Sequence, residues 1–231
     1  MHSGLNGAVV LITGASGDIG RGCARAFAAE GARLVLHANV RLDQAAVLER
    51  DLDTECLAVQ ADLRNEAQVQ EMFAAALKKF GRLNGVVANA GVWPPHDTPI
   101  HEMDLIQWEN TVAVNLTGVF LTARAYFRYL HRQRPDNASL VIVGSSAAVF
   151  GEAGHADYAA SKAGAVYGLT RTLKNEIVKL CPDGRVNAVN PGWTITEMTK
   201  GALDDQALVN RVMQTRPLKQ LSTPEDTANA V

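Results

Sequence analysis

The sequence has few cysteines, little excess charge and no long apolar run. Its 231 residues include three cysteines, which are far apart and form no C-x-x-C pair. This usage is typical of reduced thiols, and we expect a cytoplasmic protein. A net charge of −2 gives no basic surface for nucleic acid. No stretch approaches the roughly 18 apolar residues of a membrane span, so neither nucleic acid nor a membrane is an expected partner.

Metal-binding spacings and a signal peptide are also missing. The six histidines are dispersed and include no H-E-x-x-H motif, which argues against a metal site. The first residues, MHSGLNGAVVLITGAS, lack a basic region and a cleavage pattern. Their apolar run instead predicts a strand.

What the sequence does contain is 47% hydrophobic residues without an internal repeat or linker, and we expect a single domain over residues 1–231. Apolar runs predict strands at residues 8–13, 32–37, 56–61, 85–89, 140–143 and 185–189. Helical periodicity follows them at residues 19–31, 42–51, 69–80, 104–133 and 156–180. This alternation predicts an α/β fold, a doubly wound parallel sheet with helices on both faces.

The last residues of the sequence predict the start of another helix. Thr223 is in position to cap its N-terminus, with Pro224 in the first turn. Six strands alone would leave residues 185–189 at an unpaired edge. We therefore expect that a final strand is missing and that the natural chain continues beyond Val231.

Tyr158 and Lys162 are four residues apart in DYAASKAG, which places them on one face of a helix. An ammonium beside a phenol favours the phenolate. At about 5 Å and an effective dielectric constant of about 20, the interaction is worth roughly 3 kcal/mol, or about two pKa units. The pair therefore predicts a tyrosine pKa lowered toward about 8, which suits a proton donor. The alternative is an interface tyrosine beside a solvated lysine.

A glycine-rich segment, TGASGDIG at residues 13–20, follows the first predicted strand and opens the first helix. Glycines at this point let backbone N–H groups approach a pyrophosphate. The alternative is a tight strand-to-helix turn, but the position after the first strand of an α/β chain favours dinucleotide binding.

Six motifs, in order, resemble those of the short-chain dehydrogenase/reductase family. They are TGASGDIG (13–20), ANAG (88–91), VNLTG (114–118), VGSSAAV (143–149), YAASK (158–162) and NPGWTITEMT (190–199). The resemblance implies a Rossmann-type, NAD(P)-dependent oxidoreductase that interconverts a carbonyl and a secondary alcohol by hydride transfer. One alternative is a 3-oxoacyl-thioester reductase, which the family includes. A rival from another class is a dinucleotide-binding regulator without catalysis.

The resemblance also implies the catalytic residues. Tyr158 would be the general acid/base, and Lys162 would lower its pKa and hold the nicotinamide ribose. Ser145, selected over Ser146 by the family's spacing to the tyrosine, would bind the substrate oxygen. Asn115 would hold a water in a proton relay behind Lys162.

The cofactor site is implied by the same resemblance. Its residues would be Gly14, Ser16, Gly17, Asp18, Ile19, Gly20, Ala38, Asn39, Arg41, Asp62, Leu63, Asn89, Ala90, Gly91, Tyr158, Lys162, Pro191, Gly192, Thr194 and Thr196. Asp18 stands where the family has its middle glycine, and we expect its carboxylate to face outward and complement the helix dipole. Asp62 would contact the adenine amino group.

The end of the second strand indicates the cofactor preference. Residues 37–41, HANVR, contain no carboxylate for a ribose hydroxyl. Arg41 is a candidate partner for a 2′-phosphate. The sequence therefore favours NADP over NAD, with NAD still possible.

The expected substrate is a small carbonyl or alcohol compound of unknown identity, in a cleft walled by Trp93 and Trp193. A hydrolase triad of Ser145, His155 and Asp157 is disfavoured because no G-x-S-x-G elbow is present. Small and aromatic residues on the long helices at 104–133 and 156–180 suit close helix packing. We therefore expect a homo-oligomer, most simply a tetramer.

Overall fold

Six parallel strands form one sheet in the computed structural model, which describes residues 3–215 and 218–231. The strands are β1 (Val9–Ile12), β2 (Arg33–Ala38), β3 (Cys56–Gln60), β4 (Gly85–Ala88), β5 (Ser139–Val143) and β6 (Arg185–Val189). Their order is β3-β2-β1-β4-β5-β6, so the winding direction reverses between β1 and β4. This is the doubly wound parallel sheet that the sequence predicts, and each strand lies within about a residue or two of its expected position.

The side chains of β1 show why its apolar run is continuous. Val9 and Leu11 belong to the hydrophobic core on one face of the sheet. Val10 and Ile12 belong to the core on the other face. Because successive side chains of a strand point to opposite faces, a strand covered on both faces has no polar positions.

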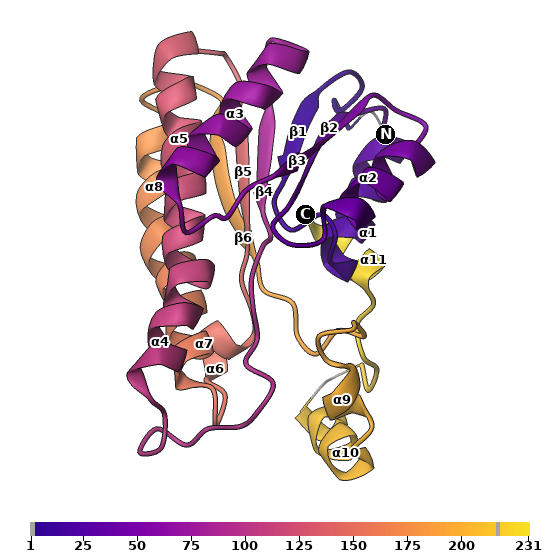
Figure 1. Cartoon of the computed structure of the whole chain (residues 1–231), viewed down its shortest axis with the longest axis vertical. Helices are drawn as coiled ribbons and strands as arrows, with labels where there is room; N and C mark the ends of the chain where they lie inside the picture. The colour runs from indigo at the N-terminus through magenta and orange to yellow at the C-terminus, as the bar shows by residue number, and fades with distance from the viewer. Residues whose placement is uncertain (1–2, 216–217) are drawn as a thin grey trace.

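Two layers of helices enclose the sheet (Figure 1). One face carries α1 (Asp18–Ala29), α2 (Leu42–Asp51) and α11 (Pro224–Ala230). The other carries α3 (Glu66–Phe80), α5 (Gly118–Gln133) and α8 (Arg171–Ile177). No helix in the described ranges is long and apolar enough to cross a membrane.

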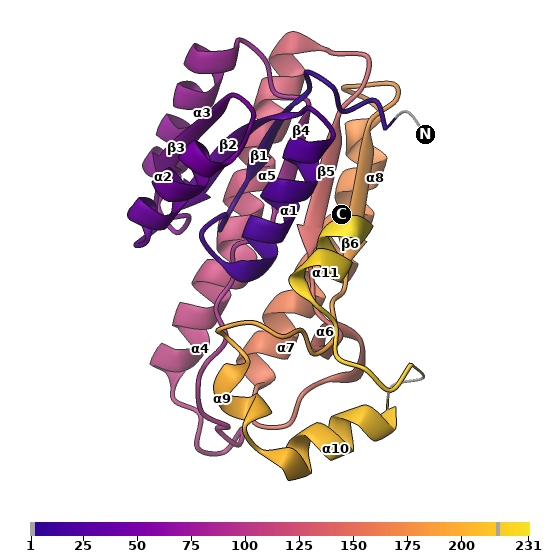
Figure 2. The ribbon, with the colours of Figure 1, turned by 90° about the vertical axis from the view of Figure 1, so that its right-hand side faces the viewer.

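The remaining helices gather beyond the carboxyl ends of the strands (Figure 2). They are α4 (Leu105–Val112), α6 (Ala147–Phe150), α7 (Ala156–Ala163), α9 (Lys200–Leu203) and α10 (Gln206–Thr215). A π-helical turn, η1 (Ala113–Thr117), joins α4 to α5, and a second, η2 (Gly164–Thr170), joins α7 to α8. The two long helices predicted from the sequence are therefore present, each with a π-helical turn inside it, and the second ends at Ile177 rather than near residue 180.

Helix α11 begins as the sequence predicts. The Thr223 hydroxyl accepts a hydrogen bond from the Asp226 N–H, and the Asp226 carboxylate accepts one from the Thr223 N–H. This capping box satisfies two backbone donors that the helix itself leaves unpaired. The helix packs on α1 at Gly22, where an added Cβ would lie 3.1 Å from the Pro224 carbonyl oxygen.

Candidate active site

The glycine-rich segment connects β1 to α1 in a tight turn. Gly14 has a positive φ of 67°. An added Cβ at Gly20 would collide with the Gly14 carbonyl oxygen, so the turn requires glycine there. Gly17 is the N-cap of α1, and no side chain caps that end of the helix. The first backbone N–H groups of α1 are therefore available to an anionic ligand, and the turn fits the pyrophosphate of a dinucleotide.

Residues after β4 hold this turn in place. The Thr13 hydroxyl oxygen accepts hydrogen bonds from the N–H groups of Asn89 at 3.0 Å and Ala90 at 3.1 Å. The Asn89 amide donates to the carbonyl oxygens of Thr13 and Gly14. At Gly91 an added Cβ would lie 3.2 Å from both the Asn115 Oδ1 and Lys162 Nζ atoms. The predicted motif at 88–91 therefore joins the glycine-rich turn to the residues expected to be catalytic.

His37 supports the same turn, although the sequence analysis assigns it no role. Its Nδ1 accepts a hydrogen bond from the Gly14 N–H at 3.1 Å, so Nε2 carries the proton and donates to the Ala61 carbonyl oxygen at 2.9 Å. The side chain is buried, and burial lowers the pKa of the imidazole. The one signal in the sequence is a polar residue at the end of an apolar strand.

Asp18 occupies the first turn of α1, as predicted. The sequence did not predict its partners. One carboxylate oxygen forms an ion pair with Arg21, and the other accepts the Glu197 N–H at 2.8 Å. Asp18 therefore joins α1 to the segment that follows β6. Arg21 also donates to the Ser16 carbonyl oxygen at 3.2 Å.

The other residues expected to bind the cofactor lie around this turn. Ala38 ends β2 and is buried, as is Leu63 after β3. Asn39 and Arg41 are exposed, and Arg41 is the N-cap of α2. Ile19, in the first turn of α1, packs partly buried against the core. These positions lie at or beyond the carboxyl ends of β1, β2 and β3.

Asp62 is already paired within the chain. Arg64 donates to both of its carboxylate oxygens at 2.6 to 3.0 Å, and this hydrogen bonding lowers the pKa of the Asp62 carboxyl. Contact with an adenine amino group would have to share these oxygens, so this role stays a prediction.

Four residues expected to be catalytic come from different elements but lie close together. Ser145 follows β5, Tyr158 and Lys162 lie on α7, and Asn115 lies in η1. The Ser145 hydroxyl accepts the Ala147 N–H at 3.1 Å and lines the same pocket as Tyr158. The Lys162 ammonium lies 5.8 Å from the centre of the tyrosine ring and donates to the Val143 carbonyl oxygen at 2.8 Å.

Asn115 is completely buried. Its amide pairs with the backbone of Val92, accepting from the N–H at 2.8 Å and donating to the carbonyl oxygen at 2.9 Å. This pairing fixes the chain after β4 against the long helix. The role expected for Asn115 in a proton relay stays a prediction.

The predicted direction of the tyrosine pKa shift is wrong. Burial raises the pKa of Tyr158, the nearby Ser145 hydroxyl lowers it, and the nearby Glu152 carboxylate raises it. Burial also lowers the pKa of Lys162 to about 8. The attraction between an ammonium and a phenolate favours both charged forms, but here the cost of removing each charge from water outweighs it.

The hydrolase triad does not form. The Asp157 carboxylate accepts hydrogen bonds from the Thr111 hydroxyl at 2.7 Å and from the Tyr158 N–H at 2.8 Å. The imidazole of His155 pairs through Nε2 with Asp97 at 3.0 Å. Asp157 therefore joins α4 to α7, and His155 is held by the loop before α4.

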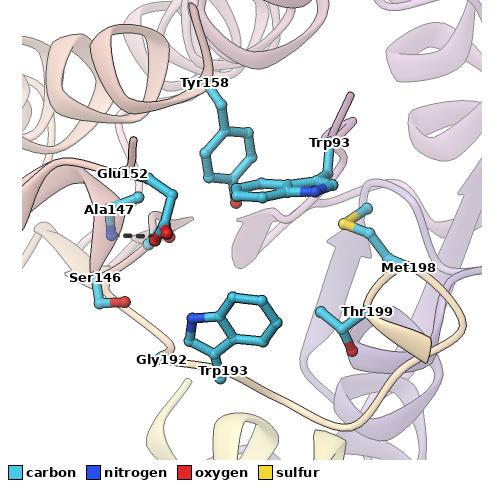
Figure 3. Close-up of a pocket in the computed structure, with 10 residues that line it drawn as sticks. Trp93, Ser146, Ala147, Glu152, Tyr158, Gly192, Trp193, Met198 and Thr199 are labelled. Carbon is cyan, nitrogen blue, oxygen red and sulfur yellow. Dashed lines mark hydrogen bonds between the residues drawn. The ribbon is translucent and has the colours of Figure 1, made fainter. Parts of the chain in front are cut away.

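A pocket opens beside Ser145 and Tyr158 (Figure 3). It encloses about 480 Å³ of empty space, its open mouth included. Trp93 and Trp193 line it, as the sequence predicts. The Trp93 ring packs against His155 with ring centres 3.7 Å apart and meets the Tyr158 ring edge-on at 4.6 Å. The pocket therefore has aromatic walls and a phenol at its base.

Several residues that line the pocket are not among the site residues predicted from the sequence. They are Ser146, Ala147, Glu152, Met198 and Thr199. Ser146 and Ala147 belong to the motif at 143–149, and Met198 and Thr199 end the motif at 190–199. Nothing in the sequence marks Glu152, which comes from a loop whose course depends on the rest of the fold.

The segment after β6 forms the remaining wall. The Pro191 carbonyl oxygen accepts the Ser146 N–H at 2.9 Å, and Gly192 lines the pocket. The Thr194 hydroxyl donates to the Gly192 carbonyl oxygen at 3.0 Å. The Thr196 hydroxyl lies 3.1 Å from the hydroxyl of Thr199. In the described part of the chain, no group of three or more metal-ligating side chains is present.

The comparisons identify the family. A family model described as "Enoyl-(Acyl carrier protein) reductase" matches residues 14–231. The chain is 34% identical over 230 residues to a 3-oxoacyl-[acyl-carrier-protein] reductase of Synechocystis, covering 98% of this chain and 88% of that protein. The chain belongs to the short-chain dehydrogenase/reductase family.

Solved structures agree with this short-chain dehydrogenase/reductase fold. Levodione reductase superposes with a TM-score of 0.88 at 30% identity, over 97% of this chain and 89% of that chain. A 3-ketoacyl-(acyl-carrier-protein) reductase from Brucella melitensis, complexed with NADH, has a TM-score of 0.86 at 28% identity, over 98% and 89%. The protein is a nicotinamide-dependent oxidoreductase that interconverts a carbonyl and an alcohol.

Proposed function

We propose that this enzyme interconverts a small ketone and a secondary alcohol, with Tyr158 as general acid/base and NADP(H) as the preferred cofactor. The observation that carries this assignment is the convergence of Ser145 and Tyr158 on one aromatic pocket, with the Lys162 ammonium buried behind them. Asn115 fixes the wall of the same site through Val92.

The chain itself supplies position and a proton. The Ser145 hydroxyl donates to the substrate oxygen, and the Tyr158 phenol gives its proton to that oxygen as negative charge develops there. The Lys162 ammonium stabilises the phenolate that remains. Because burial raises the pKa of Tyr158, the phenol is protonated at neutral pH, which is the form that reduction needs. The bound nicotinamide supplies or accepts the hydride.

Backbone groups would hold the cofactor. The glycine-rich turn and the N-terminus of α1 suit the pyrophosphate, and the backbone at Asn89, Ala90 and Gly91 borders the same space. Lys162 would hold the nicotinamide ribose, and the segment from Pro191 to Thr196 would border the nicotinamide. These roles rest on the turn geometry and on the family's motifs.

The preference for NADP(H) rests on the end of β2. Residues 38 to 41 contain no carboxylate that would repel a 2′-phosphate, and Arg41 is exposed at the start of α2. A guanidinium at this point can pair with a phosphate through two hydrogen bonds.

We also propose a homotetramer in the cytoplasm. Apolar side chains remain exposed on the long helices and on α6, including Phe120, Tyr167 and Val149. Phe150, at the end of α6, is 85% exposed. Helix packing between subunits would cover such side chains.

A second candidate function is reduction of 3-oxoacyl thioesters. The name of the Synechocystis relative favours it, because that protein is a 3-oxoacyl-[acyl-carrier-protein] reductase. A regulator without catalysis is the remaining alternative, and the presence of Ser145, Tyr158, Lys162 and Asn115 at one site argues against it.

The test is turnover by Tyr158→Phe with a panel of ketones, 3-oxoacyl thioesters and both reduced cofactors. We expect a loss of about 10²- to 10⁴-fold in kcat with little change in cofactor affinity, because the phenylalanine lacks only the proton donor. Tyr167→Phe, which changes a partly exposed tyrosine outside the pocket, is the matched control. More than half of the wild-type activity in Tyr158→Phe would refute the assignment.

The cofactor preference is tested by the ratio of kcat/KM for NADPH and NADH. Arg41→Ala should lower this ratio, and Ala38→Asp should lower it further by placing a carboxylate against the 2′-phosphate. Because the Ala38 side chain is buried, thermal unfolding checks that this variant folds. A wild-type preference for NADH, unchanged in Arg41→Ala, would refute the proposal.

A further inference from the structure

Glu152 places a carboxylate in the pocket, and the proposed mechanism gives this carboxylate no role. The residue lies in the loop between α6 and α7 and is half-buried. Figure 3 shows its carboxylate turned toward the hollow that Ser145 and Tyr158 border. Among the described residues, none donates a hydrogen bond to this carboxylate or forms an ion pair with it. Its two oxygens are therefore available to a bound molecule.

The other walls supply no charge to balance this carboxylate. Of the ten described residues that line the pocket, Glu152 is the one with a charged side chain. Trp93, Trp193 and Met198 present apolar surface to the same space. A substrate that fills the pocket must strip water from the carboxylate, which is unfavourable unless the substrate replaces the lost hydrogen bonds.

The electrostatic surroundings point in the same direction. Burial raises the pKa of Glu152, the nearby His155 lowers it, and Asp97 raises it. The pKa is raised overall, so the His155 ring compensates the negative charge of Glu152 only in part. A hydroxyl or an ammonium on the substrate would supply a donor, whereas a second carboxylate would add a like charge.

We propose that Glu152 is a specificity-determining residue that accepts a hydrogen bond from a second donor group on the substrate, a hydroxyl or ammonium close to the reacting carbon. The same residue disfavours substrates that carry a carboxylate there. The inference rests on the proposed function, because Tyr158 and Ser145 define where the reacting carbon lies. It adds the class of substrate: hydroxy- or amino-substituted ketones and the corresponding alcohols.

The experiment compares four alcohols on one ring: cyclohexanol, cis-1,2-cyclohexanediol, 2-aminocyclohexanol and 2-hydroxycyclohexanecarboxylate. The wild-type holoenzyme is compared with Glu152→Ala and Glu152→Gln, and kcat/KM is measured for each alcohol with the preferred cofactor. Glu197→Gln is the matched control, because it removes a nearby acidic side chain that does not line the pocket.

The wild type should prefer the diol or the amino alcohol to cyclohexanol. In Glu152→Ala this preference should fall about 10- to 100-fold, the range expected for a hydrogen bond to a charged group. In the same variant, kcat/KM for 2-hydroxycyclohexanecarboxylate should rise relative to kcat/KM for cyclohexanol. Glu152→Gln distinguishes the two donors, because its amide oxygen still accepts from a hydroxyl but no longer attracts an ammonium. Glu197→Gln should behave like the wild type.

Two results would overturn the proposal. In the first, the kcat/KM values of the diol and the amino alcohol relative to cyclohexanol are the same in Glu152→Ala as in the wild type. In the second, Glu152→Ala lowers kcat/KM equally for all four alcohols. If the wild type turns over none of them, the proposed function is contradicted for this class of compound. Calorimetric binding of the same four alcohols to the wild-type holoenzyme and to Glu152→Ala then still decides whether Glu152 selects among them.

Discussion

The hydrogen bond between Asp18 and the Glu197 N–H joins two walls of the active site. Asp18 belongs to the first turn of α1, and Glu197 directly precedes Met198 and Thr199, which line the pocket. The Asp18 side chain is 20% exposed and is also paired with Arg21. Replacing Asp18 with alanine therefore removes the one side-chain contact that the structure shows between the carboxylate and this pocket wall.

The magnitude follows from the type of bond. A hydrogen bond to a charged group contributes about 1.5 to 3 kcal/mol, and partial exposure places this one near the lower limit. About 1.4 kcal/mol corresponds to tenfold in an equilibrium constant. We therefore expect the KM for the carbonyl substrate to rise about tenfold in Asp18→Ala. Asp18→Asn retains an acceptor oxygen without the charge and should raise the KM about two- to threefold, since a neutral hydrogen bond contributes about 1 kcal/mol, or about 0.5 kcal/mol less than this one.

A second effect works in the opposite direction on the cofactor. Both variants remove a negative charge at the end of α1, where the pyrophosphate is expected to bind, so cofactor affinity should increase in both. The comparison of Asp18→Ala with Asp18→Asn separates the two effects, because the variants differ in the acceptor but not in charge. The assay measures cofactor affinity by titration of nicotinamide fluorescence and substrate KM at saturating cofactor.

Glu197→Gln is the control for this experiment, because it leaves the backbone N–H that Asp18 binds. Its KM should equal that of the wild type. Equal substrate KM values in Asp18→Ala and Asp18→Asn would refute the argument, and so would a Glu197→Gln variant that behaves like Asp18→Ala.

Two further predictions concern stability and assembly. Burial lowers the pKa of His37 from 6.5, so below that pH the unfolded chain binds more protons than the folded one and the free energy of unfolding should fall. His37→Asn, which keeps an acceptor for the Gly14 N–H, should flatten this dependence in urea unfolding at pH 5 and pH 7, and an unchanged slope would exclude His37 as its source. Size-exclusion chromatography with light scattering should give the mass of four chains, and Phe150→Ser should reduce it; a monomeric wild type would contradict the proposed tetramer.

The sequence alone was sufficient to predict the sheet, its helical layers and the place of the glycine-rich turn. The run VVLI in β1 has no polar residue because both faces of the strand are covered. Burial on both faces therefore shows in the sequence as four consecutive apolar residues. Tyr158 and Lys162 share a helix face because helical geometry fixes where residues four apart lie. Patterns of this kind are local, so they can be recognised without knowledge of the rest of the chain.

The tertiary structure decided the features that depend on distant segments. Asp18 meets the backbone of a residue 179 positions away. Glu152 faces the pocket because a loop places it there, and His37 supports Gly14 across neighbouring strands. The sign of the Tyr158 pKa shift was also decided at this level. Helical spacing reports the nearby ammonium, but the cost of a charge depends on how much water the whole fold excludes, and no local pattern encodes that quantity.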